Sequence, residues 1–147
     1  TQSTLQERLV RALEQLRHDT GAQHVVMAML DKGNNELRSR ITLGCDDQAS
    51  ICQLKVKLDQ PHLFRLLLSK QQSVWINARN RKKYIDYLTL LPLEPLREKD
   101  FFAMSLWVRN KPLGLIYADN QDNSEIHYQH FRTHCARIIA LLGGKVL

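Results

Sequence analysis

The sequence lacks any apolar run near the roughly 20 residues that a membrane-spanning helix needs. Its opening segment, TQSTLQERLVRALEQL, is charged and amphipathic, without the uninterrupted apolar centre of a signal peptide. Prolines and glycines are few, four and six among 147 residues, and 44% of the residues are hydrophobic. We therefore expect a single cytoplasmic domain over residues 1–147 with no membrane contact. Because the sequence opens on Thr1, we expect it to be a fragment of a longer multidomain polypeptide.

Cysteine is also scarce. Cys45, Cys52 and Cys135 are odd in number and show no CxxC spacing, so the sequence indicates neither a disulfide framework nor a thiolate zinc site. Reduced thiols fit the expected cytoplasmic location.

The motifs of common catalytic sites are missing as well. There is no Gly-rich phosphate loop, no G-x-S-x-G nucleophile elbow and no H-E-x-x-H helix. The carboxylates of two turn regions stand beside Gly, Asn and Ser, where acidic residues favour local hydrogen bonds and no acid/base pair follows. These residues are Asp46, Asp47, Asp119, Asp122 and Glu125. We expect no catalytic residue, no cofactor and no enzyme activity.

The net charge of +6 raises the question of a nucleic-acid partner. The basic run Arg79–Lys83, beside Tyr84 and Tyr87, is the only segment that resembles a phosphate contact with aromatic neighbours. A solvated loop explains it equally well, and recognition-helix and ribonucleoprotein motifs are missing, so we expect no nucleic-acid binding. The same cations could instead bind an anionic small molecule.

Three histidines, His127, His130 and His134, follow helical spacing near the C-terminus. They flank the apolar stripe of their helix, and no fourth ligand is apparent. Border positions of an amphipathic surface helix explain them, so we assign no metal site.

Hydrophobic periodicity predicts the order of elements. Thr4 and Glu7 form a capping box before a helix that ends at Asp19-Thr20-Gly21, and a second long helix begins near Ser124 and ends at Gly143-Gly144. Strands are expected over 24–31, 36–43, 53–58, 73–76, 101–108 and 113–118, with a helix from Pro61 to about Gln71. Pro92 and Pro95 limit the leucine-rich segment after Tyr84 to a short helix and a long connection.

Alternation assigns faces within these elements. In the second strand Leu37, Ile41 and Leu43 are expected on one face, with Arg38, Arg40 and Thr42 on the other. The last helix is expected to bury a stripe of Tyr128, Phe131, Cys135, Ile138 and Leu142. The result is an α+β fold: an antiparallel sheet carries the N- and C-terminal helices on one face. The other face lies under the mid-chain segments and becomes the expected pocket.

The segment FFAMSLWVRNKPLGLIYADN, from Phe101 to Asn120, is similar to the penultimate hairpin of GAF domains, with Leu113-Gly114-Leu115-Ile116 as its signature. The whole element order resembles the GAF fold, and the hairpin resembles still more closely the C-terminal region of bacterial HDOD-domain signalling proteins. The resemblance implies a regulatory or sensory domain of a bacterial signal-transduction protein.

The residues that mark known GAF ligands have no counterpart here. The Asn-Lys-Phe-Asp-Glu constellation of cyclic-nucleotide sites and the Cys-His pair of bilin sites are both missing. GAF-like methionine-sulfoxide reductases use clustered cysteines, whereas here only Cys45 and Cys52 lie near each other, with nothing placed to activate a thiolate.

Aromatic and polar residues give the candidate lining of the pocket. A buried indole needs a partner for its N–H, and strands carry both tryptophans. The candidate ligand-binding residues are Trp75, Tyr84, Tyr87, Ser105 and Trp107. Plain core packing explains them equally well.

Two functions remain open. In the first, the domain binds an unknown small molecule or docks to an upstream domain of the same polypeptide, with a possible homodimer through the terminal helices. In the second, the pocket of a degenerate GAF fold is filled by its own leucines, and the domain is purely an interaction or dimerisation module. The residues that favour the second are Leu88, Leu90, Leu91, Leu93 and Leu96.

Overall fold

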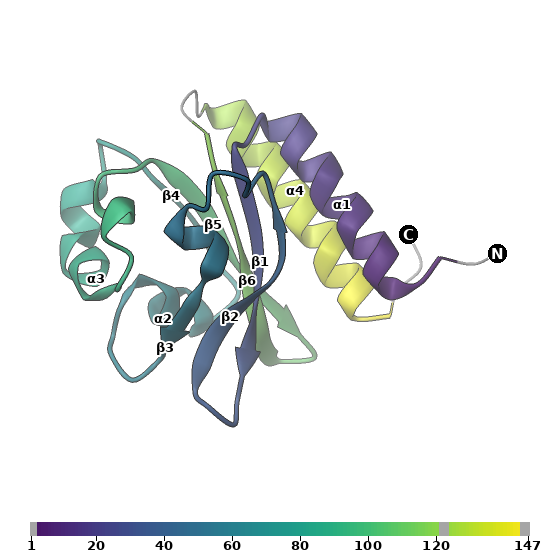
Figure 1. Ribbon diagram of the computed structural model, residues 1–147, viewed down its shortest axis with the longest axis horizontal. Helices are drawn as coiled ribbons and strands as arrows, with labels where there is room; N and C mark the ends of the chain where they lie inside the picture. Colours follow the sequence, from purple (N-terminus) through teal and green to yellow (C-terminus); the bar gives the residue numbers. More distant parts are fainter. Residues whose placement is uncertain (1–2, 121–123, 145–147) are drawn as a thin grey trace.

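A six-stranded antiparallel sheet runs through the centre of the protein in the computed structural model, which describes residues 3–120 and 124–144 (Figure 1). From edge to edge the strands are β3 (Lys55–Lys57), β2 (Glu36–Leu43), β1 (His24–Asp31), β6 (Lys111–Asp119), β5 (Phe101–Val108) and β4 (Ser73–Ile76). The two central strands, β1 and β6, pair directly although they are far apart in sequence. The predicted α+β architecture is confirmed.

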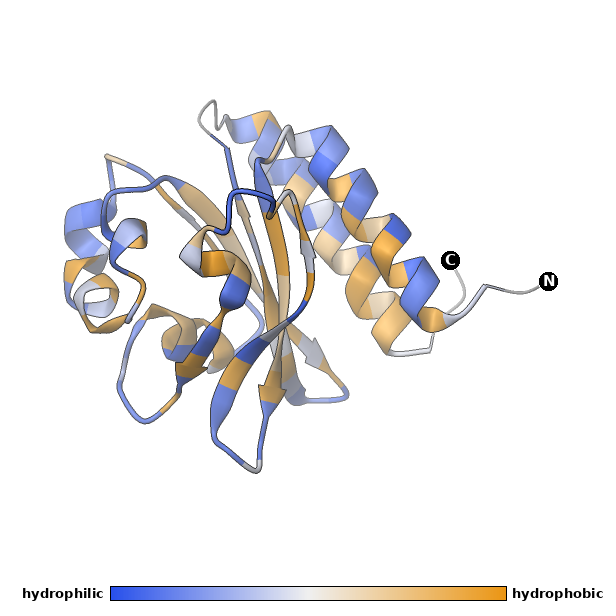
Figure 2. Ribbon diagram, viewed as in Figure 1, coloured by the Kyte–Doolittle hydropathy of each residue, from blue (hydrophilic) through white to orange (hydrophobic). Residues whose placement is uncertain are grey.

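The two long helices, α1 (Leu5–Thr20) and α4 (Glu125–Leu142), lie side by side and antiparallel on one face of the sheet (Figure 1). The predicted capping box of Thr4 and Glu7 begins α1, and Gly21 ends it in the left-handed conformation. Both helices carry hydrophobic and hydrophilic residues in turn (Figure 2), and their buried residues pack in one core with residues of the sheet. The predicted stripe of α4 is confirmed, with Phe131, Cys135 and Ile138 completely buried.

Short helical segments cover the opposite face of the sheet. They are η1 (Ser50–Gln53), α2 (Leu63–Leu68), η2 (Arg81–Tyr84), α3 (Ile85–Leu90) and η3 (Glu94–Arg97). The prolines do limit this region to short pieces, as expected. A second hydrophobic core joins these segments to the sheet, so each face of the sheet has its own apolar layer.

The prediction of one apolar face for β2 was wrong. Met27 pairs with Ile41 while Ala28 pairs with Ser39, so Arg40 is the extra residue of a β-bulge. The bulge shifts the alternation by one residue, which exchanges the two faces beyond it. Leu37 therefore packs in the core under the short helices, whereas Ile41 packs under α1 and α4.

The middle helix begins later than predicted and is shorter. Leu63 rather than Pro61 is its first residue, and α2 ends at Leu68. His62 is the N-cap: its Nδ1 accepts the backbone N–H of Arg65 at 3.2 Å. Histidine is not among the usual N-cap residues, so the sequence did not indicate that α2 begins after His62. Among residues 3–120 and 124–144, no helix combines the length and apolarity needed to cross a membrane.

Candidate functional site

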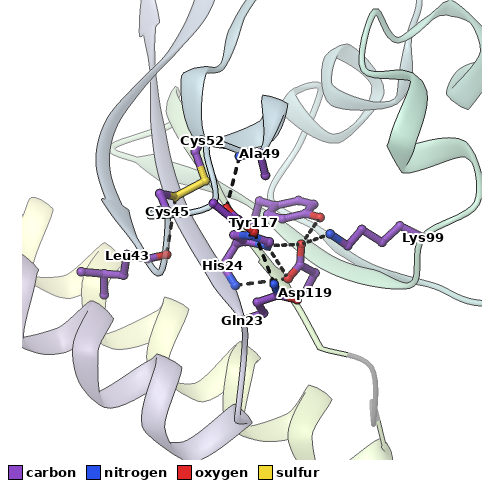
Figure 3. The surroundings of a disulfide bond; sticks show 10 residues. Gln23, His24, Leu43, Cys45, Ala49, Cys52, Lys99, Tyr117 and Asp119 are labelled. Atoms are coloured by element: carbon purple, nitrogen blue, oxygen red, sulfur yellow. Dashed lines mark hydrogen bonds and ion pairs between the residues drawn. A yellow bond between two sulfur atoms is a disulfide. The ribbon is translucent and has the colours of Figure 1, made fainter.

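A buried polar cluster lies where β1 begins and β6 ends (Figure 3). His24 is the first residue of β1 and pairs across the sheet with Asp119, the last residue of β6; each is only 1% exposed. Tyr117, Lys99 and Asp47 complete what we call the His24 cluster. Strand alternation places His24, Tyr117 and Asp119 on the face that the short helices cover.

Asp119 is the centre of this cluster. Its carboxylate accepts the backbone N–H of His24 at 3.2 Å, faces His24 Nδ1 at 3.0 Å and accepts the Tyr117 hydroxyl at 2.6 Å. The Lys99 ammonium lies 3.1 Å away and supplies an opposite charge. A buried carboxylate needs such partners to offset its lost hydration. Burial, reinforced by the Asp119 charge, raises the pKa of Tyr117 well above its ordinary value, so its hydroxyl remains a donor.

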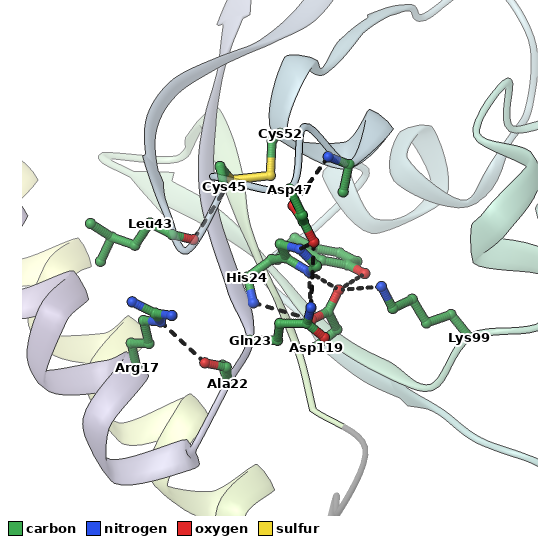
Figure 4. A network of polar contacts seen from close by, with 12 residues as sticks. Arg17, Ala22, Gln23, His24, Leu43, Cys45, Asp47, Cys52, Lys99 and Asp119 are labelled. Carbon is green, nitrogen blue, oxygen red and sulfur yellow. Dashed lines mark hydrogen bonds and ion pairs between the residues drawn. A yellow bond between two sulfur atoms is a disulfide. The ribbon is translucent and has the colours of Figure 1, made fainter.

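The second ring nitrogen of His24 contacts another carboxylate. Its Nε2 lies 2.6 Å from Asp47 Oδ2, so the imidazole stands between Asp47 and Asp119 (Figure 4). Carboxylates only accept, and both contacts are therefore hydrogen bonds when the ring carries a proton on each nitrogen. The hydrogen bond from His24 lowers the pKa of Asp47. Two of the carboxylates that the sequence assigned to ordinary turns thus share one histidine, while Asp122 lies outside the described residues.

Asp47 is held by a short loop that a disulfide closes. Cys45 and Cys52 are bonded, with Cα atoms 5.8 Å apart, so the expectation of reduced thiols was wrong for this pair. The two cysteines are separated by 7 positions and so lack CxxC spacing, and a loop rather than a helical turn brings their sulfur atoms together. Gly44 begins it at φ +73°, where a Cβ atom would lie 1.9 Å from the Gln23 carbonyl oxygen. Cys135 stays a free thiol, and complete burial raises its pKa.

The five predicted lining residues do not converge on one pocket. Trp75 packs against Phe102 and Tyr128 under α4, on the face opposite to Tyr84 and Tyr87. The two tyrosines lie together, with ring centroids 6.4 Å apart. These placements follow from strand alternation and from the short helices that carry the tyrosines.

Ser105 and Trp107 both contact the segment before β4. The Ser105 hydroxyl donates to the Lys70 carbonyl at 2.7 Å and accepts the backbone N–H of Gln72 at 3.1 Å. The backbone N–H of Trp107 donates to Gln71 Oε1 at 2.7 Å. A register shift between Leu106 and Trp107 interrupts the alternation that had placed Ser105 and Trp107 on one face. Within the described residues the indole N–H groups of both tryptophans are buried without a hydrogen-bond partner.

The leucine-rich segment fills the face that was expected to hold a ligand. Leu88, Leu91, Leu93 and Leu96 are between 0 and 7% exposed and belong to the same core as the side chains of the sheet beneath them. Leu90 alone among the five predicted leucines is exposed, at 42%. The protein's own side chains therefore occupy the space between α3 and the sheet.

An open groove of about 930 Å³ runs along α1 and α4, and a hydrogen-bonded pair of Asp19 and His134 lines part of it. His134 Nε2 lies 2.7 Å from Asp19 Oδ2, and this hydrogen bond lowers the pKa of Asp19. His134 is 6% exposed and joins the two helices, so the expectation of a surface position was wrong for this residue. In the part of the chain that the structure describes, the histidines of α4 do not form a group of three metal-binding side chains.

The basic run is partly engaged in tertiary contacts. Arg81 donates to the Lys99 carbonyl at 2.9 Å and pairs with Asp100 at 2.5 Å, which ties η2 to the start of β5. Lys83 lies over the ring of Tyr84. Packing of the chain itself accounts for these two cations.

Comparison with known proteins identifies the fold through solved structures. No protein-family model matches the chain, and no curated protein sequence matches it. Among solved structures, the GAF domain of an Acinetobacter phosphoenolpyruvate-protein phosphotransferase is 19% identical with a TM-score of 0.69 over 98% of this chain and 85% of that one. A GAF domain/HD domain protein from Geobacter sulfurreducens is 15% identical with a TM-score of 0.74 over 95% of this chain and 92% of that one.

A third similar structure covers residues 122 to 287 of a methyl-accepting chemotaxis protein, at 19% identity and a TM-score of 0.73 over 95% of this chain and 87% of that one. Identities this low identify an architecture rather than a shared activity. The TM-scores of these three structures, between 0.69 and 0.74 over at least 95% of this chain, show that they share its overall architecture. The chain has the fold of GAF domains.

Proposed function

We propose that the chain is a regulatory domain of a signalling protein and that it acts through contacts with another protein surface rather than through a ligand enclosed above the sheet. The observation that carries this proposal is the leucine-filled face. A ligand pocket needs a concave space with a few convergent polar groups. Leu88, Leu91, Leu93 and Leu96 instead form a continuous apolar core with the sheet.

The helical layer is the surface we assign to these contacts. The groove along α1 and α4 carries Arg8, Arg11 and Arg137 beside Glu14 and Asp19, which gives both signs of charge on one open surface. Such a surface can select a partner by charge complementarity. A second copy of the chain or an adjacent domain of the same polypeptide is the partner class that fits a regulatory module.

The ligand-sensing function is the second candidate, and the resemblance to GAF domains supports it. The signalling proteins among the similar structures, such as the chemotaxis protein, are consistent with a sensory role for this fold. Association with an HDOD domain, a bacterial source, a cytoplasmic location and the absence of enzyme activity remain predictions. Trp75, Tyr84, Tyr87, Ser105 and Trp107 remain the predicted ligand contacts under this function.

Native mass spectrometry of the freshly purified chain tests the proposal, because it reports bound small molecules and stoichiometry together. We expect the mass of the chain without a retained small molecule, and a dimer fraction that rises with concentration. The charge reversal Arg11→Glu in the groove should lower that fraction. Lys55→Glu, an exposed position on the edge strand β3, makes the same change in net charge and should leave it unchanged.

A stoichiometric small molecule retained by the purified chain would overturn the contact-based proposal in favour of the sensor. A chain that stays monomeric at every concentration and carries no small molecule would exclude the homodimer. An adjacent domain would then be the remaining partner.

A further inference from the structure

We propose that the disulfide loop and the His24 cluster form a redox-controlled Zn²⁺ site, in which reduction of the disulfide frees Cys45 and Cys52 to bind the metal together with His24 and Asp47. This inference goes beyond the proposed regulatory function and does not depend on it. It rests on the geometry of four side chains from two distant parts of the sequence.

The donor atoms already lie together. One ligand atom from each of His24, Asp47 and Cys52 falls within 4.8 Å of the others, and the sulfur of Cys45 is bonded to that of Cys52. In a tetrahedral zinc site with Zn–N near 2.1 Å and Zn–S near 2.3 Å, neighbouring ligand atoms are about 3.4–3.8 Å apart. The His24 Nε2 to Asp47 Oδ2 distance of 2.6 Å must widen by about 1 Å, and Asp47 sits on a short loop, with its side chain 45% exposed.

Asp119 provides the independent observation that this histidine is built as a ligand. Histidines that bind zinc almost always donate their other ring N–H to a carboxylate or carbonyl, which fixes the tautomer and the ring orientation. His24 Nδ1 lies 3.0 Å from both oxygens of Asp119, and Asp119 is itself held by Tyr117 and Lys99. The ring therefore presents Nε2 toward Asp47, and the Cys52 sulfur lies within 4.8 Å of a ring nitrogen.

The redox step balances with an ordinary thiol reductant. Two equivalents of a small thiol, or one dithiol protein, transfer two electrons and two protons to the Cys45–Cys52 bond and leave as a disulfide. Metal binding then releases one proton from each cysteine thiol, and one from His24 Nε2 when the ring is protonated, to solvent. The Zn²⁺ ion takes the place of the proton between Nε2 and Oδ2. In the oxidised chain the sulfur atoms are not thiolates, so the site lacks two of its four ligands.

The donor set selects the metal. Two thiolates, one imidazole and one carboxylate suit Zn²⁺ in tetrahedral geometry, whereas Mg²⁺ and Ca²⁺ prefer oxygen ligands only. Spacing within the sequence could not reveal this site, because His24 comes from β1 and the other three ligands come from the loop after β2.

The test is a Co²⁺ titration of the full chain, since Co²⁺ occupies tetrahedral zinc sites and absorbs visible light. The chain is reduced anaerobically with a dithiol, freed of reductant by gel filtration, and titrated with Co²⁺ and then with Zn²⁺. We expect one Co²⁺ per reduced chain, with tetrahedral ligand-field bands and thiolate-to-cobalt charge transfer, and displacement by Zn²⁺. The oxidised chain should bind at least 100-fold more weakly. Circular dichroism follows the fold in parallel.

Matched variants assign the ligands. Cys52→Ser and Asp47→Asn should each weaken Co²⁺ binding at least 10-fold, and Asp119→Asn by about 10- to 100-fold through loss of the carboxylate that orients His24. Asp46→Asn removes the adjacent exposed carboxylate, which belongs to neither the His24 cluster nor the candidate ligand set, and should bind as the unmodified chain does. Cys135→Ala removes the third thiol and should preserve the charge-transfer band.

Equal affinity of the oxidised and reduced chains, or a Cys52→Ser variant that binds as tightly as the unmodified chain, would overturn the proposal. If the reduced chain unfolds without metal, refolding on addition of Co²⁺ supports the site, because binding then supplies folding free energy. Failure to refold with Co²⁺ overturns it. The dimer measurements of the proposed function are unaffected by either result.

Discussion

Truncation of one leucine in the segment over the sheet tests whether this face is a packed core. Leu91 is 0% exposed and follows α3 directly, whereas its neighbour Leu90 is 42% exposed. The two side chains therefore differ in burial while sharing the same segment. Leu91→Ala removes three buried carbons, and Leu90→Ala removes the same three from a position that water already reaches.

The expected cost follows from burial. Three buried carbons at about 0.8 kcal/mol each give about 2.4 kcal/mol, and the cavity left behind raises the loss of unfolding free energy toward about 5 kcal/mol. Leu90→Ala should change it by less than about 1 kcal/mol. Urea unfolding followed by the fluorescence of Trp75 and Trp107 measures both. With an m value of about 2 kcal/mol/M, a loss of 3 kcal/mol moves the midpoint by about 1.5 M.

A cost for Leu91→Ala no larger than that for Leu90→Ala would refute the reasoning. Leucines that line an open, ligand-ready space leave little packing to lose, whereas leucines that fill a core lose both transfer free energy and contacts. Such a result would restore the enclosed-ligand sensor as the leading function.

Two further predictions concern the pH dependence of stability at His62 and the backbone conformation at Gly44. Burial is the largest cause that lowers the pKa of His62 below its ordinary value of 6.5 in the folded chain. The unfolded chain therefore binds the proton more readily than the folded chain does. The stability contributed by neutral His62 is complete above about pH 6.5 and is lost as the pH falls through the lowered pKa. Urea midpoints measured from pH 7.5 to 5.5 should therefore decline less in His62→Asn, which keeps an acceptor for the α2 cap without titrating, and parallel profiles would contradict this. Gly44→Ala should destabilise the protein by more than about 2 kcal/mol, because of its positive φ and the approach of the new Cβ to the Gln23 carbonyl. Thermal unfolding measures this loss, and Gly33→Ala is the control, because its new Cβ would lie 3.6 Å from the nearest atom, Asp31 Oδ1. Equal shifts of the unfolding temperature in the two variants would show that the loop at Gly44 adapts to the new Cβ.

Much of the fold could be predicted because its signals are local. The capping box of Thr4 and Glu7, the stop at Gly21 and the hairpin with strands predicted over 101–108 and 113–118 each depend on residues close in sequence. The hydrophobic periodicity of the two long helices then indicates which face of each helix is buried. These signals were sufficient for the order of elements and the position of α1 and α4.

The candidate site could not be predicted because its partners are distant in sequence. His24 and Asp119 are 95 residues apart and meet only when β1 pairs with β6. Asp47 looks like an ordinary turn residue, and nothing local indicates that its loop folds back onto β1. The bulge at Arg40 is also invisible to a pattern that assumes strict alternation, and it alone exchanges the faces of Leu37 and Ile41.

The disulfide loop and the helical layer meet at the short segment between α1 and β1. The Arg17 side chain of α1 donates to the Ala22 carbonyl at 3.2 Å (Figure 4). Its guanidinium also lies beside Gly44, where the loop begins. Two residues after Ala22 comes His24. A shift of the loop on metal binding would therefore move the contacts of Arg17, near the C-terminal end of α1. Such a shift changes contacts of the helical layer only if the partner binds the two arrangements with different affinity, and linkage then requires that the partner changes the affinity for the metal by the same factor.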